Sequence, residues 1–218
     1  PIVVGIGGND TKNIIKQIKR NNLEKVDAIL SISPYYNKPS QEGIYQHYKT
    51  ISQETALPII IYNVPGRTMS NVDSDTTLRL AHDVKNIVAV KEASGNLEQA
   101  MRIVKNKPTN FTVISGEDSL TLPLMSIGAE GVISVVTNAF PEVYSQLVSS
   151  MLKGDIAEAN KHHYSLIEVI DLLFIEGNPS GVKEALKHLN ICESYVRLPL
   201  TQVSEQTKNS LYKAIANN

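Results

Sequence analysis

Short apolar runs alternate with longer amphipathic segments along the first part of the chain. The runs are four or five residues long and rich in valine and isoleucine. They are Ile2–Ile6, Ala28–Ile32, Ile59–Tyr62, Ile87–Lys91, Phe111–Ser115 and Gly131–Val135. Continuous apolar runs of this length are typical of parallel strands that are buried on both faces. The pattern therefore predicts six strands of one parallel sheet.

Helical patterns fill the intervals between these runs. The predicted helices are Thr11–Lys19, Gln41–Thr55, Asp75–Asp83, Leu97–Val104, Leu120–Ile127 and Val143–Leu152. A capping side chain stands near the start of several of them, at Asp10, Ser40, Asp73, Asn96 and Asp118. The runs begin at residues 2, 28, 59, 87, 111 and 131. That spacing is the rhythm of successive β/α units.

The number of units favours an α/β fold of the closed-barrel type. A TIM (β/α)8 barrel needs eight units, and six are visible here. An open doubly wound sheet can also hold six strands. However, the turn Gly5–Asn9 continues with Asp10 and so lacks the G-x-G-x-x-G phosphate fingerprint. We therefore predict a partial barrel, units 3–8, over residues 1–153, with the first two units absent from this sequence.

After Gly154 only helical patterns remain. Apolar residues between Ile156 and Phe174 recur at three- and four-residue spacing and form one helical stripe. Asn178 and Pro179 predict the N-cap and first residue of a helix that ends near His188. Ser204 predicts the cap of a last helix that runs toward Ala216. Residues 154–218 are therefore predicted to form a C-terminal helical region beside the barrel.

Charge and cysteine content narrow the class of partner and the compartment. The chain has 21 basic and 22 acidic residues, a formal net charge of −1. A near-neutral chain has no long-range field to gather nucleic acid or anionic lipid. No apolar run approaches the roughly 20 residues of a membrane span, and no signal peptide is visible. The single cysteine, Cys192, cannot form an internal disulfide, so we expect a cytoplasmic protein.

The candidate chemistry lies at the strand ends, because a β/α barrel carries its reactive groups there. Lys91 ends the apolar run Ile87–Val90. A lysine in the low dielectric of a barrel mouth has a lowered pKa, and a neutral amine can attack a ketone to form an imine. A solvated lysine at a strand end is the alternative. Position alone therefore does not decide between the two.

Four other side chains at or just after strand ends have comparable alternatives. Tyr62 can transfer protons, or it can be a rim aromatic whose hydroxyl binds loop backbone. Arg67 follows in a Pro-Gly turn, where it can clamp a carboxylate or form a surface ion pair. Tyr35 and Tyr36 point to opposite sides if the segment is extended, so one can face the pocket. The histidines lack metal-ligand spacing, and we expect no metal.

Seven segments, in order and spacing, resemble the dihydrodipicolinate synthase family. They are Pro34–Gly43, Tyr62–Thr68, Val90–Asn96, Ser115–Asp118, Gly131–Ser134, Glu176–Pro179 and Arg197–Leu200, and they extend over the whole chain. The resemblance implies a class I aldolase-type lyase that condenses pyruvate with L-aspartate-4-semialdehyde through a lysine Schiff base. The implied product is 4-hydroxy-tetrahydrodipicolinate, in the first committed step of the diaminopimelate route to lysine.

The same resemblance assigns roles to the residues at the strand ends. Lys91 matches the family's imine lysine, and Tyr62 matches its proton-transferring tyrosine. Arg67 matches the arginine that holds the carboxylate of the semialdehyde. N-acetylneuraminate lyases, which share the lysine and the tyrosine, usually lack an arginine in this turn. Arg67 therefore favours the synthase over the alternative of another pyruvate-dependent lyase for sialic or keto-sugar acids.

Further roles follow from the resemblance for three more residues. Tyr36 matches the relay tyrosine that reaches the active site of a neighbouring subunit, so a homodimer or homotetramer is expected. Ile133 matches a residue of the pyruvate pocket, and Gly116 an adjacent backbone position. The implied mechanism needs no metal and no organic cofactor.

One family feature has no counterpart in this sequence. The family's Gly-Thr-Thr turn lies in the second unit of the barrel and supplies a relay threonine and part of the pyruvate carboxylate site. Roughly 70 upstream residues that contain such a turn are expected from two β/α units. If the protein is a true fragment, a third interpretation applies: an inactive fragment or binding module with exposed strand edges.

Feedback inhibition is predicted to be weak. Lysine-sensitive members of the family have a carboxylate one helical turn after the residue that matches Asn9. In this chain that position is Asn13, with Lys12 beside it. A cationic inhibitor loses an ion-pair partner, so lysine is expected to inhibit weakly or not at all. Steady-state assays with added lysine check this, and strong inhibition at sub-millimolar lysine would contradict it.

Overall fold

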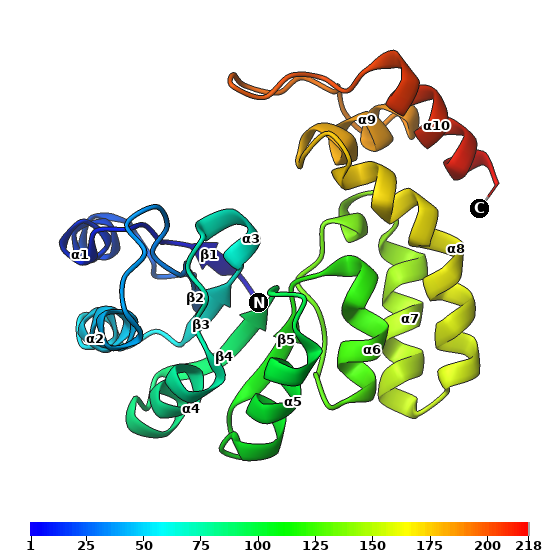
Figure 1. The fold of residues 1–218 in the computed structure, drawn as a ribbon. Helices are drawn as coiled ribbons and strands as arrows, with labels where there is room; N and C mark the ends of the chain where they lie inside the picture. Colours follow the sequence, from blue (N-terminus) through cyan, green and yellow to red (C-terminus); the bar gives the residue numbers. More distant parts are fainter. Residues whose placement is uncertain (218) are drawn as a thin grey trace. The chain divides into compact units, whose positions relative to one another are not determined.

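The computed structural model describes residues 1–217, and its first half alternates parallel strands with helices (Figure 1). The five strands are β1 (Val3–Gly5), β2 (Ala28–Ile32), β3 (Ile59–Asn63), β4 (Ile87–Glu92) and β5 (Thr112–Ser115). They form one sheet in the order β1-β2-β3-β4-β5, and each pairs in parallel with its neighbour in sequence. This is the arrangement of consecutive units of a β/α barrel, and it confirms the predicted fold class.

The helices between these strands begin where their capping residues predict. They are α1 (Thr11–Arg20), α2 (Gln41–Ser52), α4 (Ser74–Asp83) and α5 (Leu97–Asn106). In each, the predicted N-cap side chain accepts a backbone N–H of the first turn. These caps are Asp10, Ser40, Asp73 and Asn96. The short helix α3 (Pro65–Thr68), which follows β3, was not predicted.

The prediction of a sixth strand over Gly131–Val135 is wrong. In the described residues this segment makes one parallel bridge, between Ser115 and Val132. The backbone N–H groups of Val135 and Val136 donate to the Asp118 carboxylate, at 3.0 and 2.9 Å. Because these donors are turned toward a side chain, they cannot extend a strand ladder. The chain continues instead as the 3-10 turn η2 (Val136–Asn138).

The remaining part of the chain is helical, as predicted. It contains η1 (Asp118–Leu120), α6 (Thr121–Ser126), α7 (Pro141–Lys153), α8 (Ile156–Phe174), α9 (Ser180–His188) and α10 (Glu205–Ala216). The predicted stripe of α8 is buried at Ala159, His163, Leu166, Val169, Ile170 and Leu173. Ser204 caps α10 as predicted, whereas the cap of α9 is Pro179, one residue later than expected.

Two compact units can be distinguished by their internal contacts. The first comprises Pro1–Glu117 and Ile127–Ile133 and contains the sheet with α1 to α5. The second comprises Asp118–Ser126 and the residues from Ser134 onward, which form the helices from η1 to α10. The division into residues 1–153 and 154–218 that the sequence pattern suggests stays a prediction.

The two faces of the sheet are lined by alternating residues of each strand. One face carries fully buried side chains, at Ile29, Ile59, Ile61, Val90 and Val113. The other carries the cluster of Ala28, Ile60 and Ala89, against which Leu30, Val88 and Ile114 pack. Right-handed crossovers between consecutive parallel strands place all their helices on one side. The fully buried face is therefore the helix-covered face, and the cluster lies on the barrel's interior face.

An extra residue in β4 sets the alignment of the carboxyl ends of β3 and β4. Ile59 pairs with Ile87, but Ile60 pairs with Ala89, so the register shifts by one residue. Val88 is the extra residue of this bulge. Beyond it, Tyr62 pairs with Lys91, and Asn63 pairs with Glu92. In a regular ladder that kept Val88 and continued from the pairing of Ile59 with Ile87, Tyr62 would pair with Val90.

Candidate active site

Lys91 and Tyr62 lie against each other at the carboxyl ends of β4 and β3. The Nζ atom of Lys91 is 4.1 Å from the centroid of the Tyr62 ring. Lys91 is only 8% exposed, and Tyr62 is half-buried. The face of an aromatic ring attracts a cation at this distance. Tyr62 can therefore stabilise positive charge at Nζ, on an ammonium or on an iminium.

The phenol of Tyr62 is held in its protonated form. Burial raises the pKa of Tyr62 above its usual value, the positive charge of Arg67 lowers it, and the charge of Glu117 raises it. The net direction is upward, so the phenol carries its proton at neutral pH. A protonated phenol beside the amine can donate that proton and take it back later.

Gly116 lies directly against the Lys91 side chain. Its N–H donates to the Glu92 carbonyl at 2.8 Å. A Cβ atom at this position would lie 2.7 Å from Ala93 Cβ and 2.9 Å from Lys91 Cε. The neighbouring Ile133 is held by its N–H, which donates to the Ser115 carbonyl at 3.0 Å. The role of both residues in pyruvate binding stays a prediction.

Substitution of Gly116 with alanine is expected to slow the reaction of Lys91. The new Cβ would overlap both Ala93 Cβ and Lys91 Cε. Because the alanine cannot rotate away, the lysine side chain must shift. A displacement of about 1 Å can cost roughly a hundredfold in rate. The measurement is the rate of trapping of a pyruvate imine by borohydride, with the melting temperature recorded alongside.

Gly8→Ala is the matched control for this substitution. A Cβ atom at Gly8 would meet Ile14 Cγ1 at 3.7 Å, an ordinary contact, so this variant is expected to react like the wild type. If Gly116→Ala also reacts at the wild-type rate, the close approach of its backbone to Lys91 has no part in catalysis.

Arg67 lies in the short helix α3, immediately after β3. Pro65 occupies the first turn of this helix, and Met69 ends it with φ +57°. The buried hydroxyl of Thr68 is 3.1 Å from the Val64 carbonyl and accepts the Ser70 N–H at 3.2 Å. The turn is therefore fixed by its own hydrogen bonds. The exposed guanidinium of Arg67 lies near enough to Tyr62 to lower the pKa of its phenol.

Tyr36 is joined to this turn by its backbone and not by its side chain. Its N–H donates to the Thr68 carbonyl at 3.3 Å. Its φ is +74°, and the residue is 86% exposed. The chain therefore does not bring the Tyr36 side chain to Lys91. Its role in the site of a neighbouring subunit stays a prediction.

Sequence reasoning missed a buried polar group of residues behind Lys91 and Tyr62. Asn63, Glu92 and Gln99 are at most 8% exposed and are joined by hydrogen bonds. The sequence positions of two of these residues could have identified them, because Asn63 directly follows Tyr62 and Glu92 directly follows Lys91. A polar residue there must face the helix-covered side of the sheet and needs a partner.

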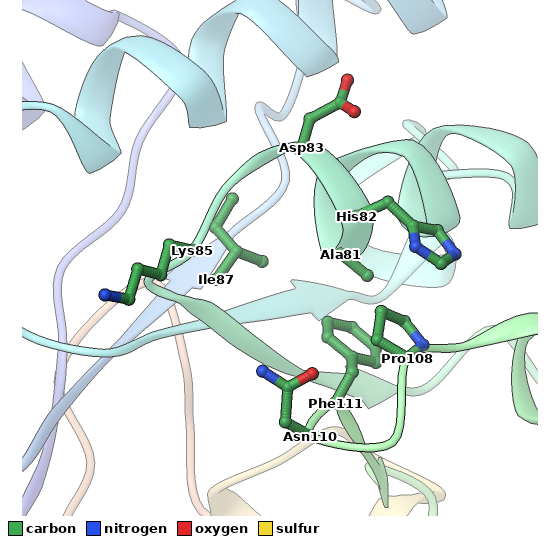
Figure 2. Close-up of a pocket in the computed structure, with 8 residues that line it drawn as sticks. All are labelled: Ala81, His82, Asp83, Lys85, Ile87, Pro108, Asn110 and Phe111. Atoms are coloured by element: carbon green, nitrogen blue, oxygen red, sulfur yellow. The ribbon is translucent and has the colours of Figure 1, made fainter.

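A separate pocket of about 290 Å³ lies at the opposite end of the strands (Figure 2). It is lined by Ala81, His82, Asp83, Lys85, Ile87, Pro108, Asn110 and Phe111. Ile87 begins β4 and Phe111 precedes β5, so the pocket is at the amino ends of these strands. In a β/α barrel this end serves stability, whereas the chemistry occurs at the carboxyl ends.

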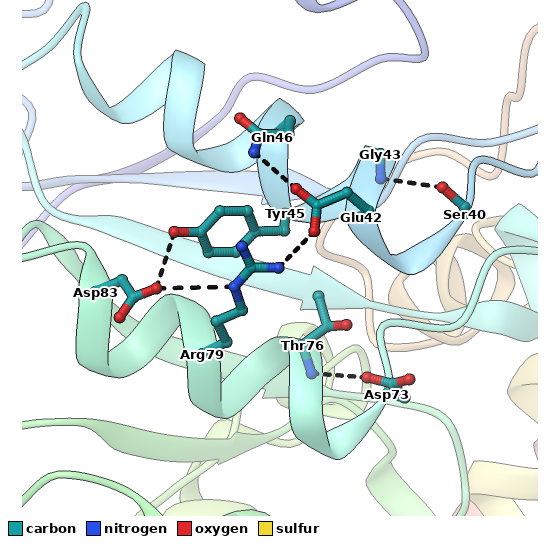
Figure 3. Close-up of polar contacts among 9 residues, drawn as sticks. All are labelled: Ser40, Glu42, Gly43, Tyr45, Gln46, Asp73, Thr76, Arg79 and Asp83. Atoms are coloured by element: carbon teal, nitrogen blue, oxygen red, sulfur yellow. Dashed lines mark hydrogen bonds and ion pairs between the residues drawn. The ribbon is translucent and has the colours of Figure 1, made fainter.

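The helices beside the site are held together by a cluster of charged and aromatic side chains (Figure 3). The Arg79 guanidinium lies 3.5 Å from the centroid of the Tyr45 ring, and its Nη1 is 2.5 Å from Glu42 Oε2. The Tyr45 hydroxyl donates to Asp83 at 2.9 Å. These contacts join α2 to α4. Because the ion pairs are exposed, they add little to stability but orient the two helices.

Within residues 1–217, no three His, Cys, Asp or Glu side chains lie close enough together to hold a metal ion. The same residues include no helix that is both long and apolar enough to span a membrane.

The amino-acid sequence is similar to those of known proteins. The sequence model of the Dihydrodipicolinate synthetase family matches residues 1–218. The 4-hydroxy-tetrahydrodipicolinate synthase of Parabacteroides distasonis is 54% identical over 200 residues, which cover 92% of this chain and 67% of that protein. The enzyme of the same name from Phocaeicola vulgatus is 50% identical over 217 residues, which cover 100% and 73%.

Solved structures of similar proteins agree with the sequence comparison. The crystal structure of dihydrodipicolinate synthase from Aquifex aeolicus has a TM-score of 0.94 at 43% identity, and the match covers 98% of this chain and 73% of that chain. A monomeric dihydrodipicolinate synthase variant has a TM-score of 0.96 at 40% identity, and the match covers 100% and 73%. The chain thus spans 67 to 73% of the length of these four relatives.

Proposed function

Because the chain belongs to the dihydrodipicolinate synthetase family, we propose that its Lys91 site forms 4-hydroxy-tetrahydrodipicolinate from pyruvate and L-aspartate-4-semialdehyde. The activity is that of a class I aldolase-type lyase. The single observation that carries the assignment to this site is the Lys91 Nζ, which is buried at a strand end and lies 4.1 Å from the Tyr62 ring. Such an amine is suited to imine chemistry.

The reaction begins with attack of Nζ of Lys91 on the carbonyl carbon of pyruvate. The phenol of Tyr62 donates a proton to the oxygen, which leaves as water, and an iminium remains on Nζ. Loss of a proton from the pyruvate methyl group gives an enamine, whose terminal carbon attacks the aldehyde of the semialdehyde. The amino group of that substrate then displaces Lys91 from the imine carbon, which closes the ring and frees the enzyme. One carbon–carbon bond and one carbon–nitrogen ring bond form, and one water is released.

Each residue of the site contributes a separate effect to this sequence. The Tyr62 ring face stabilises the iminium charge, and its raised pKa keeps a proton available for the departing water. The backbone at Gly116 leaves room for the Lys91 side chain. Arg67 is the cation next to the phenol, where a second, carboxylate-bearing substrate can bind.

The test of this proposal is a substrate comparison with the purified protein. Pyruvate plus aspartate semialdehyde is expected to be consumed with formation of the cyclic product, which mass spectrometry identifies. N-acetylneuraminate and keto-sugar acids are expected to be cleaved far more slowly. Preferential cleavage of a sugar acid would instead support the alternative, another pyruvate-dependent lyase.

Arg67→Ala is expected to impair use of the semialdehyde and not of pyruvate. A charge-assisted bond to a carboxylate contributes about 1.5–3 kcal/mol, so kcat/KM for the semialdehyde should fall roughly ten- to a hundredfold. The rate of pyruvate imine trapping should change little. Arg79→Ala, which removes an arginine from the α2–α4 cluster, is the control. Equal losses for both substrates in Arg67→Ala would show that the residue does not discriminate between them.

We also propose a cytoplasmic homo-oligomer, either a dimer or a tetramer. The exposed Tyr36 side chain and its left-handed backbone support an interface at this loop. The exposed Cys192, with no disulfide partner, suits a reducing compartment. Light scattering of the purified protein measures the assembly. A monomer, as in the variant named among the similar structures, would remove the part assigned to Tyr36.

A further inference from the structure

A buried polar network lies immediately behind the Lys91–Tyr62 pair. Its central members are Asn63, Glu92 and Gln99, which are 0%, 2% and 8% exposed. Asn63 follows Tyr62 in β3, Glu92 follows Lys91 in β4, and the two pair with each other in register. Because strand side chains alternate, the reactive pair faces one side of the sheet and the pair Asn63–Glu92 faces the other.

The Glu92 carboxylate is bound by donors at both oxygens. Oε1 accepts the Ser94 N–H at 2.7 Å and Asn63 Nδ2 at 3.3 Å. Oε2 accepts Asn63 Nδ2 at 3.1 Å and Gln99 Nε2 at 3.1 Å. A side-chain amide in place of the carboxylate would turn an NH2 group toward one of these donors. The site therefore favours a carboxylate over an amide at this position.

Further bonds join this carboxylate to three separate segments. Asn63 Oδ1 accepts the Val72 N–H at 2.9 Å, and Asn63 Nδ2 also donates to Asn71 Oδ1 at 2.9 Å. Gln99, in the first turn of α5, accepts Asn71 Nδ2 at 2.9 Å. The end of β3, the end of β4, the start of α5 and the residues before α4 are thus joined in one network. A fully satisfied buried network of this kind is rigid.

The backbone of the same residues reaches the reactive side of the sheet. The Asn63 carbonyl accepts the Ala93 N–H at 2.8 Å, and the Glu92 carbonyl accepts the Gly116 N–H at 2.8 Å. Gly116 lies against both Ala93 and the Lys91 side chain. A shift of Glu92 would therefore be transmitted to Lys91, to its Tyr62 partner and to the backbone that lines the amine.

We propose that Glu92 is a positioning residue of this site, an inference that rests on the function proposed above. Its carboxylate, held by Asn63 and Gln99, fixes the ends of β3 and β4 so that Lys91 Nζ stays against the Tyr62 ring. Glu92 faces away from the reacting atoms and acts only by positioning Lys91 and Tyr62.

The test compares Glu92→Gln with the wild type in pyruvate imine trapping by borohydride. Glu92→Gln keeps the size of the side chain and is expected to slow trapping between roughly tenfold and a hundredfold in folded protein. The kcat should fall by a similar factor with little change in KM for pyruvate. Gln41→Ala is the control, because Gln41 binds the same segment through Asn71 O and Asp73 N without contacting Glu92.

A double-mutant cycle separates positioning from a general loss of structure. If Glu92 acts through the reactive pair, Tyr62→Phe should slow trapping less in Glu92→Gln than in the wild type. Gln99→Met removes one donor but leaves the carboxylate, and it decides the question if Glu92→Gln does not fold. A smaller slowing with the same non-additivity is expected for it.

Two failures would be distinguishable in this experiment. If the wild type traps pyruvate at Lys91 but the variants trap it equally fast, or the cycle is additive, the role of Glu92 is overturned and the proposed function stands. If the wild type forms no adduct at Lys91, the proposed function fails and the inference fails with it.

Discussion

Replacing Lys91 with arginine is expected to abolish imine formation with pyruvate and to lower kcat by roughly a thousandfold or more. Arginine preserves the positive charge and most of the length of lysine, so the fold should survive. Its guanidinium stays protonated at any accessible pH and is not a nucleophile. The loss would therefore report on the amine itself and not on the charge that it carries beside Tyr62.

The measurement is intact mass after incubation with pyruvate and borohydride, followed by peptide mapping. The wild type should gain one pyruvate-derived adduct, located at Lys91. Lys85→Arg is the matched control, because Lys85 is an exposed lysine just before the same strand, on the opposite end from the site. An adduct that maps to another lysine in the wild type would reject the assignment of Lys91.

Acid is expected to destabilise the protein strongly through His47. This histidine is 6% exposed in α2, and its Nδ1 is 2.8 Å from the Thr11 hydroxyl. Among residues 1–217 no partner lies within hydrogen-bonding distance of its Nε2. Burial lowers the pKa of His47 from the usual 6.5 to about 4. The folded protein therefore holds the ring neutral where the unfolded chain binds a proton.

The sign of the effect follows from these two values. Above pH 6.5 both states hold a neutral ring, and His47 contributes nothing to the pH dependence. Between pH 6.5 and about 4 only the unfolded chain is protonated, so the free energy of unfolding falls as the pH falls. The loss amounts to about 3 kcal/mol by the lower limit of that window. That is a large fraction of the roughly 5–15 kcal/mol by which proteins are stable.

Chemical unfolding of the wild type and of His47→Gln across this pH window checks the prediction. Glutamine does not titrate and can still bond to Thr11, so its stability curve should be flatter by about 3 kcal/mol. His82→Gln, at an exposed histidine of α4, is the matched control for the loss of a histidine. Parallel curves for His47→Gln and the wild type would mean that His47 takes up its proton in the folded state.

The strand ends and helix starts could be predicted because local chemistry determines them. Asp10, Ser40, Asp73 and Asn96 cap their helices with their own side chains, and apolar runs are enough to mark buried parallel strands. Lys91 and Tyr62 could be singled out because each ends such a run. That their side chains meet depends on the pairing of β3 with β4, which no local pattern shows.

Apart from the short helix α3, the main errors and omissions involve contacts between distant segments. Gly131–Val135 has the composition of a strand, but Asp118 binds the backbone N–H groups of Val135 and Val136 and ends the pairing. The short helix α3 is only four residues long, too short for a periodic pattern. The partners of Glu92 come from β3 and α5, so its buried network could not be recognised before the strands were aligned.

The extra residue Val88 has a consequence for transplanting this active site into another scaffold. If the two segments were copied as regular strands with Ile59 opposite Ile87, Lys91 would pair with Asn63, and the amine would face the helices. The smallest portable unit is therefore Ile59–Asn63 together with Ile87–Glu92, Val88 included.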